Sequence, residues 1–147
     1  MKYVIGIDPD SEAHGVAIYN NGKLETLEQM NLLKLAGELS TASNLYNCDV
    51  EVHIEDVNGV GAAFGARDNN HNIHVKLKMA QSIGKCKQAQ IELERFIEFY
   101  GIKLVKHKIS KMWKKDKAQF EKVTGWTARS NEDTRSAAYF GFLGLKN

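Results

Sequence analysis

The chain opens on Tyr3-Val4-Ile5-Gly6-Ile7-Asp8, an apolar run rich in β-branched residues that ends on a carboxylate. Such residues favour extended backbone, so the run predicts a first strand, Lys2 to Asp8, that delivers Asp8 to an edge of a sheet. The segments His14 to Tyr19 and Lys23 to Met30 have the pattern of two further strands. Asn20-Asn21-Gly22 separates them and favours a tight turn, because Asn and Gly tolerate positive φ. We therefore expect an antiparallel meander at the start of the chain.

The rest of the chain alternates helical and extended patterns. We expect helices over Leu32 to Tyr46, Ile73 to Tyr100 and Ser110 to Val123, strands over Val50 to Glu55 and Ile102 to Val105, and a last helix capped by Ser130 or Asn131. A helix between the third and fourth strands lets the first and fourth lie side by side as parallel neighbours. The prediction is an α/β fold: a five-stranded mixed sheet, antiparallel then parallel, flanked by helices.

Bulk properties agree with one compact domain over residues 1–147. A chain of 147 residues buries roughly 70% of the surface that its unfolded form exposes, so it needs no disulfide or structural metal. The two cysteines, Cys48 and Cys86, lack the spacing of a zinc knuckle or a secreted disulfide framework, and we expect both to be reduced. No signal-peptide pattern or apolar run of about 20 residues is present. We therefore expect a cytoplasmic protein without a membrane partner.

Acidic residues stand where the predicted elements could bring them together. Asp8 and Glu55 end two neighbouring parallel strands, and Glu132 and Asp133 begin the last helix. Carboxylates that lie close repel one another unless a hard cation neutralises them, and Mg²⁺ prefers a few carboxylate oxygens plus water. The pattern predicts a site for Mg²⁺ or Mn²⁺. Two such ions about 3.5 to 4 Å apart can activate a water molecule and stabilise the leaving oxygen during phosphodiester hydrolysis.

Positive charge is concentrated in two segments although the formal net charge is only +2. Residues 103–122 contain eight lysines against two acids, and residues 69–91 contain four lysines and no acid. Lysine runs are often only solvated faces, but beside a carboxylate cluster they favour a nucleic-acid backbone as the ligand. The candidates for nucleic-acid contact are Lys85, Lys111, Lys114, Lys117 and, in the glycine-rich loop after Glu55, Phe64.

Several motifs, taken together and in order, resemble the RuvC family of Holliday-junction resolvases, which has the RNase H-like fold. They are Gly6-Ile7-Asp8-Pro9, His14-Gly15-Val16-Ala17, Ile54-Glu55-Asp56-Val57, the segment Lys111 to Phe120, and Asn131 to Ala138. The resemblance covers almost the whole chain. It implies a homodimer that cuts four-way DNA junctions symmetrically with Mg²⁺ or Mn²⁺, with two ions at each site.

The same resemblance assigns roles to individual residues. Asp8, Glu55 and Asp133 match the metal-binding acids, and Lys111 and Lys117 match lysines that contact the scissile strand, so Lys117 joins the three acids as a catalytic candidate. The chain departs from the pattern at Ser136, because the family has a further acid one helical turn after the third ligand. Glu132 is a candidate for supplying that charge, although it lies on a neighbouring helical face. Asp10 stands where relatives often have Gly.

Simpler interpretations remain for some of these residues. Ser130-x-x-Asp133 also fits a capping box, in which the acid satisfies backbone N–H groups. Trp113 in the lysine-rich segment could stack on bases or belong to the core, and Phe64 could open a junction or fold back on the core. His71-x-x-His74 lacks a third ligand and is expected to be a polar junction.

Other functions fit part of the pattern. An RNase H-like nuclease acting on RNA or on an RNA/DNA hybrid would use the same acids. A non-catalytic or weakly catalytic DNA-structure binder would follow from a site that has decayed at Ser136. An ATPase of the actin type shares the Gly-x-Asp strand start, but it needs two domains to enclose ATP.

Overall fold

The computed structural model describes residues 1–58, 72–108 and 112–146. Along the chain it has the elements β1 (Lys2–Asp8), β2 (His14–Asn20), β3 (Lys23–Met30), α1 (Leu32–Ser43), β4 (Asp49–Glu55), α2 (Ile73–Phe99), β5 (Lys103–His107), α3 (Lys117–Thr124) and α4 (Glu132–Leu145). No helix in the described part of the chain is both long and apolar enough to cross a bilayer.

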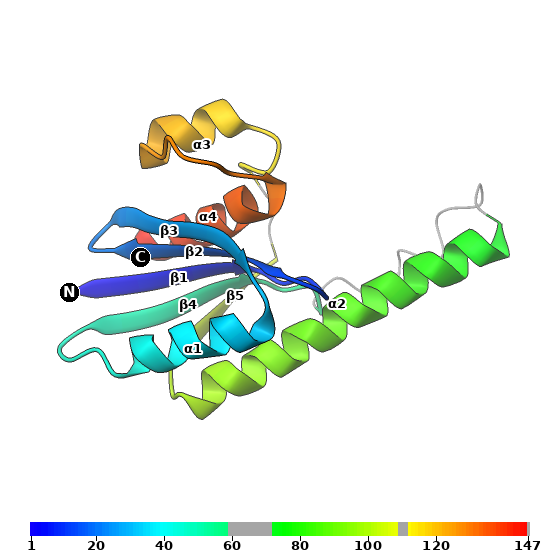
Figure 1. Ribbon diagram of the computed structural model, residues 1–147, viewed down its shortest axis with the longest axis horizontal. Helices are drawn as coiled ribbons and strands as arrows, with labels where there is room; N and C mark the ends of the chain where they lie inside the picture. Colours follow the sequence, from blue (N-terminus) through cyan, green and yellow to red (C-terminus); the bar gives the residue numbers. More distant parts are fainter. Residues whose placement is uncertain (59–71, 109–111, 147) are drawn as a thin grey trace.

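The five strands form one sheet in the order β3-β2-β1-β4-β5 (Figure 1). The β1–β2 and β2–β3 pairs are antiparallel, and the β1–β4 and β4–β5 pairs are parallel. Asn21 and Gly22 both have positive φ, 49° and 85°, as the turn between β2 and β3 requires. The expected meander, the mixed sheet and the side-by-side placement of β1 and β4 are all confirmed.

Each face of the sheet packs on its own set of helices because successive strand residues point to opposite sides. On one face, Ile5 and Ile7 of β1 pack in a core with Leu35 and Leu39 of α1 and with Leu93 of α2. On the other face, a second core contains Val4 of β1, Ala137 and Ala138 of α4, Phe120 of α3 and Trp113. Trp113 is buried, so its interpretation as a core residue is confirmed.

Helix α4 lies directly on the backbone of β1 and β2. A Cβ atom added at Gly6 would overlap the carbonyl oxygen of Ala137, and one added at Gly15 would overlap that of Asp133. The Tyr19 hydroxyl donates a hydrogen bond to the Ala138 carbonyl (2.7 Å). These contacts set the N-terminus of α4 over the start of β2, where Gly15 pairs with Asp8.

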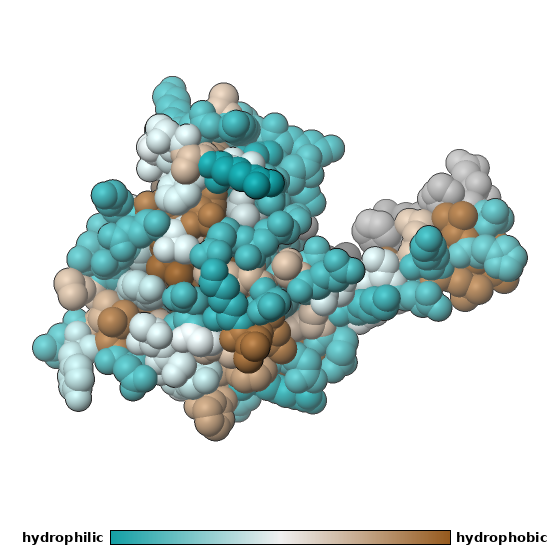
Figure 2. Space-filling view, viewed as in Figure 1, coloured by the Kyte–Doolittle hydropathy of each residue, from teal (hydrophilic) through white to brown (hydrophobic). Residues whose placement is uncertain are grey.

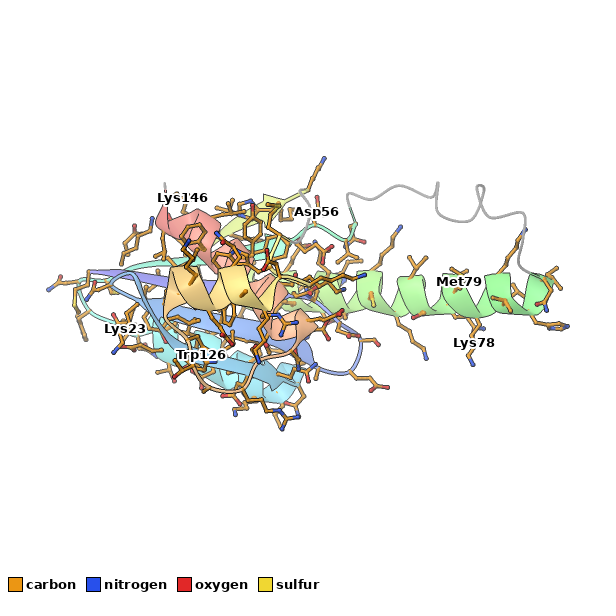
Figure 3. All side chains as sticks on the ribbon, turned by 90° about the horizontal axis from the view of Figure 1, so that it is seen from above. Lys23, Asp56, Lys78, Met79, Trp126 and Lys146 are labelled. Carbon is orange, nitrogen blue, oxygen red and sulfur yellow. The ribbon has the colours of Figure 1, made fainter. Side chains whose placement is uncertain are left out.

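Helix α2 is buried in only one of its two halves. Gln90, Leu93 and Ile97 face the core, whereas residues 73–89, here called the projecting half, have no buried side chain and for most of their length extend beyond the body of the molecule (Figure 1). Ile73 and Leu77 in the projecting half are 68% and 56% exposed, and Figure 2 shows apolar surface on this arm. Lys78 and Met79 lie far from the sheet in Figure 3.

The third helix begins later than the sequence predicted. It starts at Lys117, because the Asp116 carboxylate accepts a hydrogen bond from the backbone N–H of Gln119 (3.0 Å) and so caps it. The expected cap, Ser110, lies outside the described residues. The first helix ends at Ser43, before the predicted Tyr46, and Asn47 follows it with a positive φ of 54°.

We predict that Gly6→Ala destabilises the protein by about 1–3 kcal/mol or more, because the added methyl group collides with backbone that has no rotamer to change. The control is Gly37→Ala in α1, where an added Cβ meets no atom within 4 Å and should stabilise the helix by about 0.5–1 kcal/mol. Urea unfolding of both variants measures the two changes. Equal free energies of unfolding would contradict the close packing of α4 on β1.

Candidate metal centre and nucleic-acid interface

Asp8 and Glu55 lie on the same face of the sheet at the same edge. Ile7 of β1 pairs with Ile54 of β4, so each acid is the next residue along its parallel strand. Gly6, two residues before Asp8, touches α4, and His53, two residues before Glu55, touches Gly144 of α4. Because side chains alternate along a strand, both acids project on the α4 face. Asp8 is buried, with 5% of its surface exposed, and Glu55 is half-buried.

The acids of α4 occupy a different place. Asp133 lies in the first turn with its carbonyl over Gly15, but its carboxylate accepts a hydrogen bond from Gln29 of β3 (3.4 Å), on the side of β2 away from β1. Glu132 is exposed. Across residues 1–58, 72–108 and 112–146, no three acidic, histidine or cysteine side chains are grouped closely enough to hold a metal ion. Within the described residues, Asp8 and Glu55 thus end neighbouring strands on one face of the sheet, and no third ligand is grouped with them.

The N-terminus of α4 is capped without using Asp133. The Asn131 side chain accepts from the Thr134 N–H, and the Thr134 hydroxyl accepts from the Asn131 N–H, both at 2.9 Å. This reciprocal pair is a capping box. The alternative interpretation in which Ser130 and Asp133 form the box is therefore wrong, and the Asp133 carboxylate keeps its capacity to bind other groups.

Ser136 lies one turn farther along α4 and is fully buried. Its hydroxyl oxygen has no hydrogen-bond partner within the described residues. Leaving a buried hydroxyl unsatisfied costs about 1–3 kcal/mol, so a water molecule or ligand that reaches it would be stabilising.

Arg135 organises the lysine-rich segment, and sequence reasoning missed it. Its guanidinium group donates to the carbonyl oxygens of Trp113 (3.2 Å) and Lys114 (2.9 Å) and to the hydroxyl of Ser130 (3.2 Å). These bonds attach the segment before α3 to the helix that lies over the sheet. The signal in the sequence was an arginine directly before the small residues Ser136, Ala137 and Ala138. Small residues favour close packing of the helix, and a charged side chain at such a place needs hydrogen-bond partners.

The other predicted DNA contacts are scattered. Lys114 is half-buried, and Lys117 is exposed on α3, where its ammonium group pairs with Glu121 (3.6 Å) rather than with Asp8 or Glu55. Lys85 is exposed on α2. Lys111 and Phe64 lie outside the described residues, as does His71.

Gln90 fixes the chain that follows Glu55. Its Oε1 atom accepts from the backbone N–H groups of Val57 (2.7 Å) and Asn58 (3.2 Å), and its Nε2 atom donates to Asp56 (3.4 Å) and Glu94 (3.3 Å). Four bonds are the full capacity of one carboxamide. Gln90 is completely buried, and its polarity within the apolar stripe of α2 was the sequence signal for this role.

A chain of polar side chains, buried at Glu51 and His53, crosses the α4 face toward Glu55. Glu51 binds Lys103 (2.5 Å) and His53 Nε2 (2.9 Å), and His53 Nδ1 lies 2.8 Å from Nε2 of His107, the residue opposite Glu55 in the β4–β5 ladder. The hydrogen bond from Lys103 lowers the pKa of Glu51 to about 2, and burial lowers the pKa of both histidines. Neutral His53 then donates to Glu51 and accepts from His107. The repeat Glu51-x-His53-x-Glu55 on one strand face was the missed signal.

Comparisons with known proteins bear on the fold. No family model matches the sequence, and no curated protein matches it. Among solved structures, the chain is similar to T. thermophilus RuvC in complex with a Holliday junction substrate, with a TM-score of 0.59 and 14% identity over 95% of this chain and 90% of that one. A Thermus thermophilus RuvC structure gives a TM-score of 0.56 and 11% identity, covering 95% and 91%. This chain has a RuvC-like fold. The resemblance in the short sequence motifs and the RuvC-like arrangement of the sheet therefore agree.

We predict that Gln90→Met, which keeps the side-chain volume but removes every hydrogen bond, destabilises the protein by about 2 kcal/mol, because two backbone N–H groups lose their acceptor. Amide hydrogen exchange at Val57 and Asn58 should accelerate more than exchange in β4. The control Gln81→Met, on the exposed part of the same helix, should stay within about 0.5 kcal/mol of the wild type. Unchanged exchange at both amides would remove Gln90 from this role.

Proposed function

We propose that this protein is a divalent-metal-dependent, structure-specific endodeoxyribonuclease that hydrolyses phosphodiester bonds at branched DNA, with four-way Holliday junctions as its substrate. One observation carries the proposal: Asp8 and Glu55 end adjacent parallel strands on one face of a RuvC-like fold. The relative in complex with a Holliday junction supports the choice of substrate.

The oxygen donors at this edge fit a hard divalent cation. Mg²⁺ binds in proteins through one or two carboxylates together with water and substrate phosphate oxygens, so Asp8 and Glu55 suffice to hold one ion once DNA is present. Asp133 and Glu132 are candidates for binding a second ion, Mg²⁺ or Mn²⁺. A change of side-chain rotamer at Asp133 would break its hydrogen bond with Gln29 and leave the carboxylate able to bind a cation. Ser136 contributes a neutral hydroxyl where the RuvC resemblance leads us to expect a carboxylate.

A bound ion would lower the pKa of an attacking water molecule and neutralise the charge that develops on the phosphate. The residues of the chain orient the reaction around it. Asp8 is held rigidly because β1 is paired on both sides. The bonds from Gln90 to the residues after Glu55 limit the movement of that acid. A phosphate that approaches this edge from solvent meets both carboxylates on the α4 side.

The basic residues supply attraction for the DNA backbone without sequence information. Lys114 is presented by the segment that Arg135 holds against α4, and Lys117 begins α3. Lys111 belongs to the same lysine-rich segment. On the other side of the sheet Lys85 projects from α2. The same electrostatic role is proposed for all four lysines, whereas the placement of Lys117 on exposed α3 favours backbone contact over catalysis.

We further propose that the protein acts as a homodimer through the projecting half of α2. Met79, Ile83 and Cys86 continue the buried positions Gln90, Leu93 and Ile97 at alternating steps of four and three residues. That spacing is typical of a helix seam that packs on another helix. A symmetric pair would bury the stripe and place two Asp8–Glu55 edges on one junction, as two symmetric cuts require.

A second candidate function is a DNA-structure binder without catalysis, or with weak catalysis. It is favoured by Ser136 in place of an acid and by the absence of a three-ligand group in the described residues. Cleavage assays on four-way junctions, linear duplexes and RNA/DNA hybrids with Mg²⁺, Mn²⁺ or EDTA separate the functions. Junction binding without cleavage in either metal supports the binder, and preferential cleavage of the hybrid supports an RNase H-like activity on RNA.

We predict that Asp8→Asn and Glu55→Gln lower the rate of junction cleavage by a factor of about 100 or more, because several kcal/mol of metal-derived stabilisation is lost. Junction binding measured in EDTA should remain intact, since neither change removes a positive charge. Asp49→Asn is the matched control, because it neutralises one acid at the opposite end of β4. Comparable cleavage by Asp8→Asn and the wild type in Mg²⁺ would overturn the assignment.

We predict that a Met79→Gln and Ile83→Gln double variant is monomeric at concentrations at which the wild type is a dimer, because the seam loses its apolar contacts. Light scattering after size exclusion measures the mass. Leu77→Gln, which replaces an apolar residue on the opposite side of the same exposed helix, should leave the wild-type mass unchanged. A monomeric wild type, or an unaltered mass in the double variant, contradicts this mode of pairing.

A further inference from the structure

A hollow of about 510 Å³ lies between the β1–β2 loop, the start of α1 and the middle of α2. Its lining includes Glu12 from the loop, His14 from β2, Leu32 from α1, and Lys85, Gln88 and Ala89 from α2. We call it the loop–helix hollow. Its volume is in the range of small-molecule sites, and it contains an apolar wall, a cation and several hydrogen-bonding groups.

The hollow opens at the same edge of the sheet as Asp8. His14 precedes Gly15, and Gly15 is the partner of Asp8 in the β1–β2 ladder. His14 shares its strand face with Val16, which packs in the core covered by α1 and α2. The hollow is therefore on the side of the sheet opposite α4, and a DNA strand that crosses the edge at Asp8 would pass it.

His14 presents a hydrogen-bond donor to this space. The residue is only 4% exposed, and its Nδ1 atom accepts the backbone N–H of Asp10 (3.2 Å). Burial lowers the pKa of His14, which favours the neutral ring with its proton on Nε2. That N–H group has no hydrogen-bond partner among the described residues.

Gln88 presents a complementary acceptor. Its Nε2 atom donates to Glu92 (2.9 Å), whose charge is offset by Arg95 (2.8 Å). This bond orients the carboxamide and leaves its Oε1 atom without a donor from the described residues. Leu32 and Ala89 provide apolar contact, and Lys85 provides the positive charge at the rim.

We propose that the loop–helix hollow binds one unstacked nucleotide of the DNA strand beside the phosphate held at Asp8 and Glu55. Lys85 contacts the phosphate of that nucleotide, Leu32 and Ala89 contact the base, and His14 and Gln88 hydrogen-bond its edge. The donor–acceptor pair fits a base with an amine next to an unprotonated ring nitrogen, which adenine, cytosine and the N2–N3 edge of guanine have and thymine lacks. The inference rests on the proposed nuclease function and deepens it, because it assigns a site that selects a base.

An unpaired nucleotide fits better than a free anion or a peptide. The lysine of the hollow is matched by the carboxylate of Glu12, and Glu92 is paired with Arg95, so a highly charged anion meets no excess of positive charge there. A nucleotide combines one phosphate charge with a flat base that has hydrogen-bond donors and acceptors. These features match the single lysine of the hollow and the apolar and amide groups beside it. Proteins that bind extruded bases use this combination of apolar contact and edge hydrogen bonds.

The test replaces single bases of a four-way junction by 2-aminopurine, at successive positions on both sides of the cleaved bond. This base has the required amine beside an unprotonated ring nitrogen, and its fluorescence rises when it leaves the base stack. Among the described residues that line the hollow, the one aromatic ring is the imidazole of His14, and no tyrosine or tryptophan is present to quench the fluorescence. With the full-length protein and Ca²⁺ in place of Mg²⁺, we expect a several-fold rise at one position only.

Variants assign that signal to the hollow. Ala89→Phe fills it and should abolish the rise, and Gln88→Ala should weaken junction binding about three- to tenfold through the lost hydrogen bond. Thr41→Phe, on the exposed side of α1, controls for added bulk, and circular dichroism verifies folding. Should Ala89→Phe not fold, Gln88→Ala decides the matter by itself. It should lower the affinity for junctions that carry 2-aminopurine at the bright position more than the affinity for junctions that carry thymine there.

The outcomes distinguish the two proposals. A wild-type protein that neither binds nor cuts the junction overturns both the nuclease function and the nucleotide site. A protein that cuts the junction but brightens no position, or brightens it equally with Ala89→Phe, keeps the nuclease function and overturns the nucleotide site.

Discussion

The close contact of α4 with the backbone of β1 and β2 determines the geometry of the whole candidate site. Gly6 and Gly15 have no side chain, so the carbonyl groups of Ala137 and Asp133 can rest on the strands. This contact fixes both the height and the direction of the helix. Its N-terminus consequently lies one strand away from Asp8. Helix α4, rather than solvent, covers the face of the sheet that carries Asp8 and Glu55. A helix held farther away would leave these carboxylates in water, where they would bind a cation more weakly.

Helix α2 connects the interior of the protein to a surface that extends beyond it. Its buried half ends at Gln90, whose carboxamide holds the residues directly after Glu55. The next turn toward the N-terminus contributes Lys85 and Gln88 to the loop–helix hollow. The proposed seam residues Met79, Ile83 and Cys86 lie in the projecting half, where Met79 is exposed and the other two are half-buried. One rigid element therefore touches the candidate metal edge, the proposed nucleotide site and the proposed dimer seam.

The two sides of the sheet offer different chemistry to a strand of DNA. On the α4 side are the two carboxylates, the polar chain from Glu51 to His107, and the lysine-rich segment anchored by Arg135. On the α2 side, the lining of the loop–helix hollow includes a neutral imidazole, a carboxamide, one lysine and the acids Glu12 and Glu92. The first set suits phosphate and metal chemistry, whereas the second suits the edge of a base. A division of this kind separates the chemical step from recognition.

Much of the architecture follows from the sequence alone. The β-branched run ending at Asp8, the turn at Asn21-Gly22 and the helix between β3 and β4 imply a mixed sheet with Asp8 and Glu55 at one edge. Strand alternation and turn chemistry are local properties, and a helical crossover between two strands lets them pair in parallel. Tertiary structure alone decided the rest. Asp133 turns toward Gln29, Arg135 binds carbonyl groups more than 20 residues away, and His53 meets His107 across 54 residues. Such contacts depend on how separate elements are packed, and no periodicity within one segment encodes which distant side chain will be the partner.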